Sequence, residues 1–385
     1  MKEIYLDNAA TTKTDPKVVK AMVPYFITKY GNASSLHKLG TEAKNALEDS
    51  RKTIAKYINA KPEEIIFTSG GTESNNLTVK GLALEKKSGH IITTKIEHDC
   101  VMNACKWLET LGFKVTYLNV DGEGFINLKE LEDSIQHNTI LVSIIHANNE
   151  IGTIQNIEEI GKICKKHDIS LHIDAAQSFT KVPIDVKKQN LSFVTLNAHK
   201  IHGPKGVGAL YIRKGIKITP LSHGGGHELN LRSGTENISG IVGFAKAVKI
   251  SSSSNVKQMK KLRNYLIKEI MEKIPNVKLN GPTGDKRLCN NINFSFQGIE
   301  GEAIGALLNA NGIASSTGSA CSSKSLEPSH VLLAIGLIPE QAHGSLRLTI
   351  SKYTTKQELD FAINKLVSAV KRLRIMSPLM DKLKF

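Results

Sequence analysis

The sequence contains no apolar run approaching the ~20 residues that a membrane-spanning helix needs. One of its longest apolar stretches, residues 331–338, has the size of a core segment. Residues 1–12 lack an apolar core and include Glu3 and Asp7, so they resemble neither a secretory signal nor an arginine-rich transit peptide. We therefore expect a protein of the cytoplasm.

Cysteine is scarce, and its spacing matches no metal-binding pattern. The five cysteines form no C-x-x-C pair, and their odd number suits a reducing compartment. Cys321 differs from the others because it lies among small polar residues, from which an exposed thiol could reach outward. We expect the remaining four to be structural: Cys100, Cys105, Cys164 and Cys289.

Arginine is scarce for so basic a chain. Only eight of the 51 basic residues are arginine, although the net charge is +15. Proteins that read nucleic-acid sequence usually rely on arginine, and no five basic residues follow one another here. We therefore expect no direct nucleic-acid binding, while affinity for anionic substrates or acidic partners stays open.

What is present indicates a globular α/β protein. Hydrophobic residues make up 40% and charged residues 23% of 385 residues, which is ordinary for a soluble protein of two or three domains. Asp15 and Pro16 predict the start of a helix that runs to about residue 30. Apolar strands then alternate with helices, which predicts a mostly parallel sheet covered on both faces. The predicted strands are 65–69, 91–94, 115–120, 140–145, 170–174 and 193–196.

The alternation ends at residues 251–255, a serine-rich joint. A long helix follows, and then strands near 291–296 and 346–350 with helices between and after them. We therefore predict a large domain at 12–255 and a small α+β domain made of 1–11 and 256–385.

Two motifs of other enzyme classes lack the required form. Residues 203–208 carry their glycines in the reverse of the dinucleotide-binding order and precede a strand. His223 and His227 have helical spacing, but the three glycines between them predict a loop. His199 and His202 form a second weak pair, and we expect no metal site.

Three polar features follow predicted strands. The glycine-rich stretch 69–74 opens a helix and suits either a phosphate or a plain turn. Asp174 ends a strand, where it either faces a ligand or caps the next segment. Lys200, taken alone, is typical of a charged residue on the surface. Together, a phosphate cradle, a carboxylate and an amine at strand ends are what pyridoxal phosphate requires.

The chain resembles the NifS/IscS-type cysteine desulfurases, pyridoxal phosphate enzymes of fold type I within the class V aminotransferases. This resemblance implies a seven-stranded, mostly parallel sheet in the large domain. The matching segments run in order along nearly the whole chain: 5–12 (YLDNAATT), 30–32 (YGN), 68–74 (TSGGTES), 97–98 (EH), 148–152 (NNEIG), 174–177 (DAAQ), 199–200 (HK), 203–206 (GPKG), 223–228 (HGGGHE), 232–235 (RSGT), 319–321 (SAC) and Arg347.

The resemblance also implies roles around the cofactor ring. Lys200 bonds the cofactor and later moves the α-proton of the substrate. Asp174 pairs with the ring nitrogen, while Gln177 and Asn149 reach the phenolic oxygen. His98 stacks on the ring and shuttles a proton; Asp99 and Cys100 follow it, where the family more usually has a small or basic residue and then alanine.

The resemblance also implies which residues bind the substrate carboxylate and which bind the cofactor phosphate. Arg347 clamps the substrate carboxylate in a bidentate fork, and Asn32 contacts the same end of the substrate. The phosphate is held by residues near the first motif and before Lys200, with one residue from the second subunit of a homodimer: Gly71, Thr72, Asn197, His199 and Thr235.

Cys321 is implied to be the nucleophile that takes sulfur from L-cysteine, leaving a persulfide on the protein and releasing L-alanine. The persulfide would serve iron–sulfur cluster assembly through a scaffold protein and, as a second destination, tRNA thiolation. Two alternatives stay open. One is a selenocysteine lyase or another pyridoxal phosphate enzyme of this fold. The other is a partner in a sulfur-transfer complex that has no catalytic role.

Overall fold

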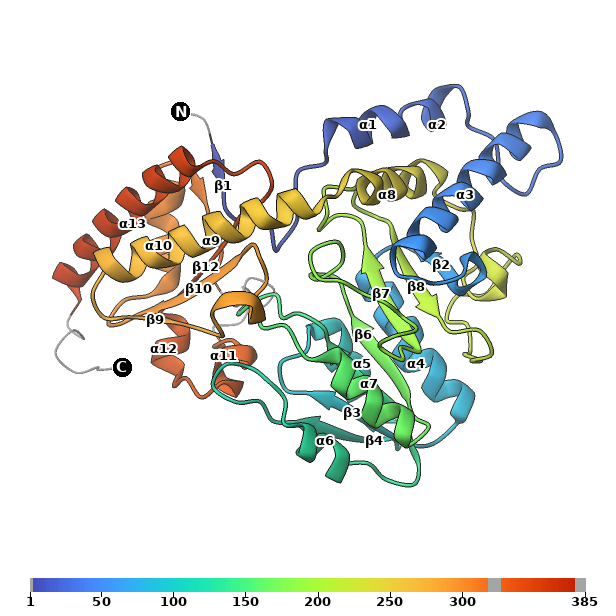
Figure 1. Ribbon diagram of the computed structural model, residues 1–385, viewed down its shortest axis with the longest axis horizontal. Helices are drawn as coiled ribbons and strands as arrows, with labels where there is room; N and C mark the ends of the chain where they lie inside the picture. Colours follow the sequence, from blue (N-terminus) through green and yellow to red (C-terminus); the bar gives the residue numbers. More distant parts are fainter. Residues whose placement is uncertain (1–2, 318–326, 378–385) are drawn as a thin grey trace.

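The computed structural model describes residues 3–317 and 327–377, which form a larger and a smaller lobe. Figure 1 shows the smaller lobe on the left, crossed by the long helix α9 (Ser253–Lys273) that leads into it from the larger lobe. Ser252 caps the first turn of α9, and α8 (Ile238–Ile250) ends just before it. The predicted joint is therefore a short break between two helices.

The larger lobe is built on a seven-stranded sheet within the described residues. Its strands share one direction except β8, which runs antiparallel to both of its neighbours. The prediction of a mostly parallel sheet is thus confirmed. In spatial order the strands are β2 (Ile65–Thr68), β8 (Gly208–Ile212), β7 (Phe193–Asn197), β6 (Ser170–Asp174), β5 (Thr139–Ile145), β3 (His90–Thr94) and β4 (Lys114–Leu118).

Both faces of the sheet are buried because successive side chains of a strand point to opposite sides. Ile65 and Phe67 pack into one core and Ile66 between them packs into the other. Helices α3, α7 and α8 supply residues to the first core, and α4 and α5 supply the second. The helices of this lobe not yet given are α3 (Lys38–Tyr57), α4 (Gly71–Lys86), α5 (Asp99–Glu109), α6 (Leu128–Asp133) and α7 (Ile157–Lys166).

The first predicted helix is shorter than expected. Asp15 does cap it, accepting a hydrogen bond from Lys17 N at 2.8 Å. The helix then divides into α1 (Pro16–Met22) and α2 (Pro24–Ile27). Pro24 has no N–H to continue the hydrogen-bond ladder, so one helix ends there and a second begins, and the predicted single run to residue 30 is wrong.

The smaller lobe has its own core and two small sheets. A three-stranded sheet has the order β12-β10-β9, and β1 (Ile4–Tyr5) pairs in parallel with β11 (Ile313–Ala314). Ile4 and Leu6 pack with residues of α9 and of the C-terminal elements, which supports the proposed small domain of 1–11 and 256–385. The other elements are β9 (Val277–Leu279), β10 (Asn291–Phe296), α10 (Gly301–Asn309), α11 (His330–Ala334), α12 (Pro339–His343), β12 (Ser345–Thr349) and α13 (Lys356–Met376).

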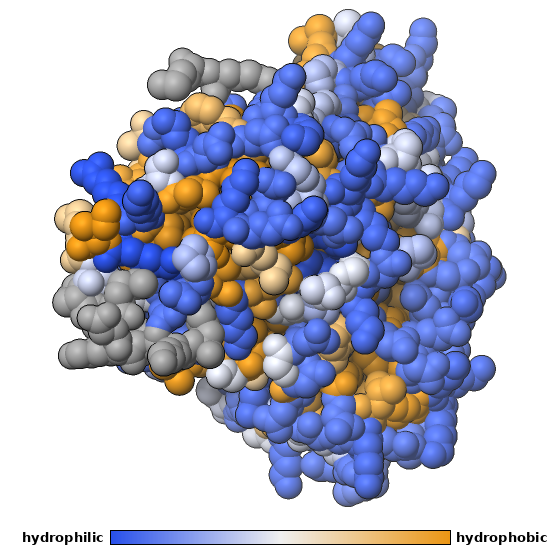
Figure 2. All heavy atoms as spheres, turned by 60° about the vertical axis from the view of Figure 1, so that its left-hand side comes forward, coloured by the Kyte–Doolittle hydropathy of each residue, from blue (hydrophilic) through white to orange (hydrophobic). Residues whose placement is uncertain are grey.

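Figure 2 shows one face on which hydrophilic side chains predominate and hydrophobic side chains lie in separate patches between them. Within 3–317 and 327–377, no helix combines the length and the hydropathy needed to cross a membrane.

His172 lies in the middle of β6 and is fully buried. Its Nδ1 is 2.8 Å from Ser143 Oγ, and its Nε2 is 3.1 Å from Thr195 Oγ1. Burial lowers the pKa of His172 to about 3, because an imidazolium there would lose its hydration. The folded protein therefore holds this histidine neutral.

Acid is expected to destabilise the fold through His172. The unfolded chain has an ordinary histidine pKa of ~6.5, so between that pH and about 3 the unfolded state binds the extra proton. The unfolding free energy should fall by about 1.4 kcal/mol per pH unit as the pH drops through this window. Urea unfolding of the native protein at about pH 7, 6 and 5 measures the slope.

The control is His172→Gln, which does not titrate and keeps an amide in the same space. Its slope should be flatter by the same amount, and equal slopes for the two proteins would contradict the assignment. Comparing the two slopes also cancels the opposite contribution of Glu97, since burial raises the pKa of Glu97 to about 8 in both.

Candidate active site

A cavity of about 340 Å³ lies where the carboxyl ends of the parallel strands meet the smaller lobe. Its volume falls in the range of pockets that bind small molecules. The structure brings ten of the predicted site residues to its wall: Gly71, Thr72, His98, Asn149, Asp174, Gln177, Asn197, His199, Lys200 and Arg347.

One end of the cavity is the first turn of α4. Gly70, just before the helix, has φ 154°, a conformation that side chains rarely adopt. The first N–H groups of any helix have no acceptor within the helix, so those of Gly71 and Thr72 are free to bind an anion. Burial lowers the pKa of His199 to about 4, and the nearby Lys200 adds to this effect. His199 is therefore a neutral hydrogen-bonding group at this end.

Asp174 lies at the centre of the cavity wall and is held by two donors. Asn75 Nδ2 donates to its Oδ2 at 2.7 Å, and the Ala176 N–H donates to its Oδ1 at 2.9 Å. Asn75 is a site residue that the sequence analysis missed. It lies one helical turn after Gly71 and is fully buried, so a polar residue on the core side of that helix was the available signal.

Lys200 follows β7, and its amine is held by the N-terminal segment. Nζ donates to the carbonyl of Ala10 at 2.7 Å and also to the carbonyl of Ala9. Gln177 Nε2 donates to that same Ala9 carbonyl at 2.9 Å. Residues near the N-terminus thus close the site around the amine, a contact that requires the chain to fold back from the smaller lobe.

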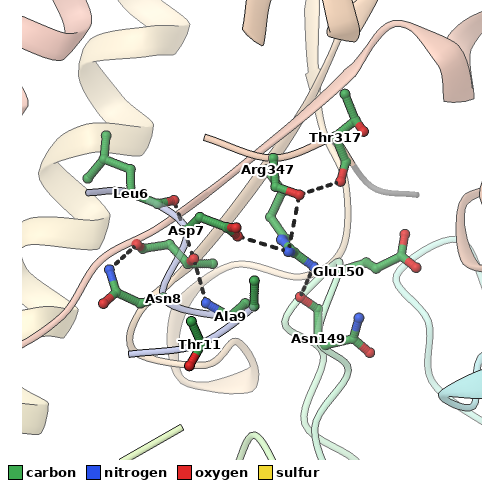
Figure 3. A network of polar contacts seen from close by, with 12 residues as sticks. Leu6, Asp7, Asn8, Ala9, Thr11, Asn149, Glu150, Thr317 and Arg347 are labelled. Carbon is green, nitrogen blue, oxygen red and sulfur yellow. Dashed lines mark hydrogen bonds and ion pairs between the residues drawn. The ribbon is translucent and has the colours of Figure 1, made fainter. Parts of the chain in front are cut away.

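Arg347, on β12, reaches the cavity from the smaller lobe. Figure 3 shows its guanidinium between Asp7 and Asn149. Nη2 is 3.1 Å from Asp7 Oδ1, and Nη1 donates to the Asn149 carbonyl at 3.3 Å. Its Nε is buried and has no hydrogen-bond partner among the described residues. Arg347 lines the cavity, so its guanidinium is placed to bind a carboxylate there.

Cys321 lies outside the described residues. The described residues on either side of it are fastened to the site. Ser316 forms an antiparallel bridge with Arg347, with N–H···O distances of 3.2 and 2.7 Å. Ser329 Oγ donates to Glu150 Oε2 at 2.6 Å, next to Asn149. Ser316 is thus bonded to a residue that lines the cavity, and Ser329 to the neighbour of one.

Two predicted residues do not line this cavity. Thr235 is exposed in a loop, as suits a residue expected to act on a second subunit. Asn32 lies between α2 and α3, where its Oδ1 accepts a hydrogen bond from Ser34 N at 2.9 Å. The predicted contact of Asn32 with the substrate therefore has no support from within one chain.

Cys105, Cys164 and Cys289 are buried in the cores, as expected of structural cysteines. That expectation is wrong for Cys100, which is partly exposed and lines the cavity. Its Sγ is 3.0 Å from both His98 Nδ1 and Asn75 Nδ2. Cys100 belongs to the site because it lies at the start of α5, whose first turn faces the cavity while its later turns face the core.

Comparison with known proteins assigns the family. The model of the class-V aminotransferases matches residues 4–361. The chain is 50% identical over 382 residues to a cysteine desulfurase IscS of Dictyoglomus turgidum, covering 98% of this chain and 97% of that protein. The chain belongs to the cysteine desulfurases of the class-V aminotransferase family. The predicted resemblance is thus confirmed.

Further relatives agree with this assignment. A cysteine desulfurase IscS of Methanosarcina thermophila is 50% identical over 387 residues, covering 99% of this chain and 95% of that protein. A solved NifS-like protein superposes with a TM-score of 0.90 at 40% identity, covering 96% of this chain and all of that one. A structure of SspA in complex with cysteine gives a TM-score of 0.82 at 39% identity, over 91% of this chain and all of that one.

Enzymes of this family depend on pyridoxal phosphate, and the residues of the cavity fit that cofactor. The free N–H groups of α4 suit its phosphate, the carboxylate of Asp174 suits a ring nitrogen, and the amine of Lys200 suits its aldehyde. Among the described residues, no group of three or more histidine, cysteine, aspartate or glutamate side chains is arranged to hold a metal ion.

Proposed function

We propose that this desulfurase uses the cavity between its lobes to remove sulfur from L-cysteine, giving L-alanine and a persulfide on Cys321. The observation that carries the assignment of the site is the convergence of Lys200, Asp174 and the first turn of α4 on one cavity. Arg347, which lines the same cavity, supports it as well. Each of these groups has a partner in the chemistry of a cofactor-bound amino acid.

When bound, pyridoxal phosphate supplies an aldehyde that bonds amines and a ring that withdraws electrons from the substrate. Lys200 would hold the cofactor through its amine, which suits that aldehyde, and would move the α-proton of the substrate. Asp174 keeps the ring nitrogen protonated, and the hydrogen bonds from Asn75 and Ala176 fix its carboxylate in place. Gln177 and Asn149 face the cavity as contacts for the ring oxygen.

Sulfur transfer falls to Cys321. Its thiolate attacks the sulfur of the substrate, so that an S–S bond forms as the substrate's C–S bond breaks. The electron pair of the broken bond stays on the carbon, which is then protonated, and alanine leaves. The fastening of Ser316 to Arg347 and of Ser329 to Glu150 supports this role, because it keeps both ends of the cysteine-bearing segment beside the substrate clamp.

The active unit we propose is a homodimer. Phe26, Ile27 and Tyr30 are between 62% and 66% exposed and follow one another along the chain. Apolar side chains gathered on a surface in this way favour an interface. Thr235 of one copy would complete the phosphate end of the other. Cys321, in the proposed small domain, would then pass its sulfur to an acceptor, such as a scaffold protein for iron–sulfur clusters or a tRNA-thiolating partner.

We propose that the enzyme works in the cytoplasm, because its described cysteines are not paired in disulfides. The four described cysteines are free, although the chain has enough of them for pairing. A persulfide also needs thiols that stay reduced until sulfur arrives.

Replacing Cys321 with serine is expected to abolish persulfide formation while leaving the bound cofactor intact. The hydroxyl of serine is a far weaker nucleophile toward sulfur than a thiolate. Holoenzyme is mixed with L-cysteine and a thiol reductant, and alanine, sulfide and protein-bound persulfide are measured. The visible absorbance of the cofactor should match that of the wild type before substrate is added.

Cys164→Ala is the matched control, because Cys164 is buried on α7 away from the cavity, and it should keep full activity. Sustained sulfide production by Cys321→Ser would overturn the sulfur relay. It would favour a lyase that releases its product directly, such as a selenocysteine lyase. A wild-type enzyme that binds cofactor but makes no alanine would favour a partner protein without catalysis.

A further inference from the structure

Four side chains form a continuous hydrogen-bonded chain under the cavity. His98 Nδ1 is 3.0 Å from Cys100 Sγ, which is 3.0 Å from Asn75 Nδ2. The same Asn75 amide donates to Asp174 Oδ2 at 2.7 Å. Cys100 thus links the imidazole expected to stack on the cofactor ring with the carboxylate expected to hold its nitrogen.

The direction of these bonds follows from the backbone. The N–H of Cys100 donates to His98 Nδ1 at 3.2 Å, because His98 caps the N-terminus of α5 with its side chain. Nδ1 therefore carries no proton and accepts. A thiol next to an accepting nitrogen is the donor, so Cys100 S–H points at Nδ1 and the ring proton of His98 is on Nε2.

The thiol remains available as a donor. Burial raises the pKa of Cys100 to about 12, and the negative charge of Asp174 adds to the rise. The sulfur's lone pairs accept from the Asn75 amide. Asn75 Nδ2 therefore has two acceptors, Cys100 Sγ and Asp174 Oδ2, which fixes the orientation of an amide whose Oδ1 has no partner among the described residues.

Resting on the proposed function, we propose that Cys100 is a positioning residue: it holds His98 in the Nε2–H form and, through Asn75, orients the carboxylate of Asp174. A proton arriving at Nδ1 of His98 would have to displace two donors. His98 then serves as a stacking ring that accepts at Nδ1 and donates at Nε2, and the α-proton is moved by Lys200. This excludes Nδ1 of His98 from the proton-shuttle role that the sequence analysis predicted for this residue.

The test compares Cys100→Ala with Cys100→Ser in the holoenzyme. Alanine removes the side-chain donor, whereas serine keeps a donor at the same position. ¹⁵N NMR of histidine-labelled enzyme, with the signal of His98 assigned from a His98→Gln sample, reports which ring nitrogen bears the proton. The wild type should show Nδ1 unprotonated, and in Cys100→Ala the share of protonated Nδ1 should rise about fivefold, the factor of one ordinary hydrogen bond.

Kinetics supply the second measurement. In Cys100→Ala, kcat for L-cysteine should fall about fivefold with KM within twofold, because Arg347 is untouched and only the ring environment changes. Cys100→Ser should restore both the NMR signal and kcat. Wild-type values for Cys100→Ala, or identical defects in the alanine and serine variants, would overturn the proposal. In the second case the volume of the sulfur, and not its proton, would be what matters.

Mass spectrometry tests the remaining alternative, in which Cys100 itself accepts sulfur. A persulfide on the Cys100 peptide of Cys321→Ser enzyme after treatment with L-cysteine would overturn the positioning role, because the S–H donor would be consumed. If the wild type makes no alanine, the proposed function fails. If the wild type is active and only the Cys100 variants behave unlike this description, this inference alone fails.

Discussion

Replacing Lys200 with alanine is expected to lower alanine formation from L-cysteine by at least about 10⁴-fold. A positioned acid–base group alone contributes up to about that factor, and Lys200 would also provide the covalent bond to the cofactor. The structure places its amine in the cavity with Asp174, held by the carbonyls of Ala9 and Ala10. The measurement is alanine released by holoenzyme, with borohydride reduction and peptide mapping to locate the cofactor.

Two further variants serve as controls for this result. Lys200→Arg keeps the positive charge but cannot form the covalent bond, so it should be as inactive as Lys200→Ala. Lys217→Ala removes an exposed lysine from the same lobe and should leave the rate unchanged. More than about one per cent residual activity in Lys200→Ala, or reduced label on another lysine, would defeat the assignment of the cofactor site.

Replacing Arg51 with methionine is expected to lower the unfolding free energy by about 3–5 kcal/mol. Arg51 and Glu228 form a buried, two-pronged ion pair with N···O distances of 2.8 and 2.7 Å. Phe67 N–H donates to the same carboxylate at 2.6 Å, and Arg51 Nη1 donates to the Ile65 carbonyl at 2.6 Å. Removing the arginine leaves a carboxylate buried without its counter-charge, which is the costly half of such a pair.

The pair also stabilises an unusual backbone. Glu228, Leu229 and Asn230 have φ values of 45°, 57° and 65°, three successive residues in the left-handed region that only glycine adopts without cost. The ion pair fastens this turn to α3 and β2. The loop that leads from it to Thr235 is therefore expected to lose order in Arg51→Met, and with it the proposed contact between subunits.

The double variant Arg51→Met/Glu228→Gln should recover much of the lost stability, since no buried charge then remains. Lys52→Met is the surface control. Lys52 pairs with Asp49 at 3.2 Å, but both side chains are more than 60% exposed, so its loss should cost under about 1 kcal/mol. Urea unfolding of all four proteins at one pH decides between these outcomes. A loss below about 1 kcal/mol in Arg51→Met, or no recovery in the double variant, would contradict the role of the pair.

Much of the larger lobe could be read from the sequence because its signals are local. Apolar strands separated by amphipathic helices predict a parallel sheet, and β6 occurs at the predicted residues. Helix starts at Asp15 and near Gly71 follow from capping and glycine signals. The break at Pro24 was equally local, and the predicted helix through residue 30 failed because its start signal at Asp15 and Pro16 was followed without regard to this second proline.

The candidate site, too, has features that the sequence predicts and features that only the tertiary structure shows. The sequence by itself indicated the chemistry, because a lysine, an aspartate and a glycine-rich helix start each follow a strand of one parallel sheet, and the carboxyl ends of such strands lie along one edge. Only the tertiary structure decided that Asp7 and Asn149 flank Arg347, that alanine carbonyls hold Lys200, and that Asn75 and Cys100 connect Asp174 to His98. Those contacts join residues up to 340 positions apart. No local pattern encodes them, since they depend on how the two lobes pack, how the N-terminal segment folds back between them, and how α4 and α5 lie against the sheet.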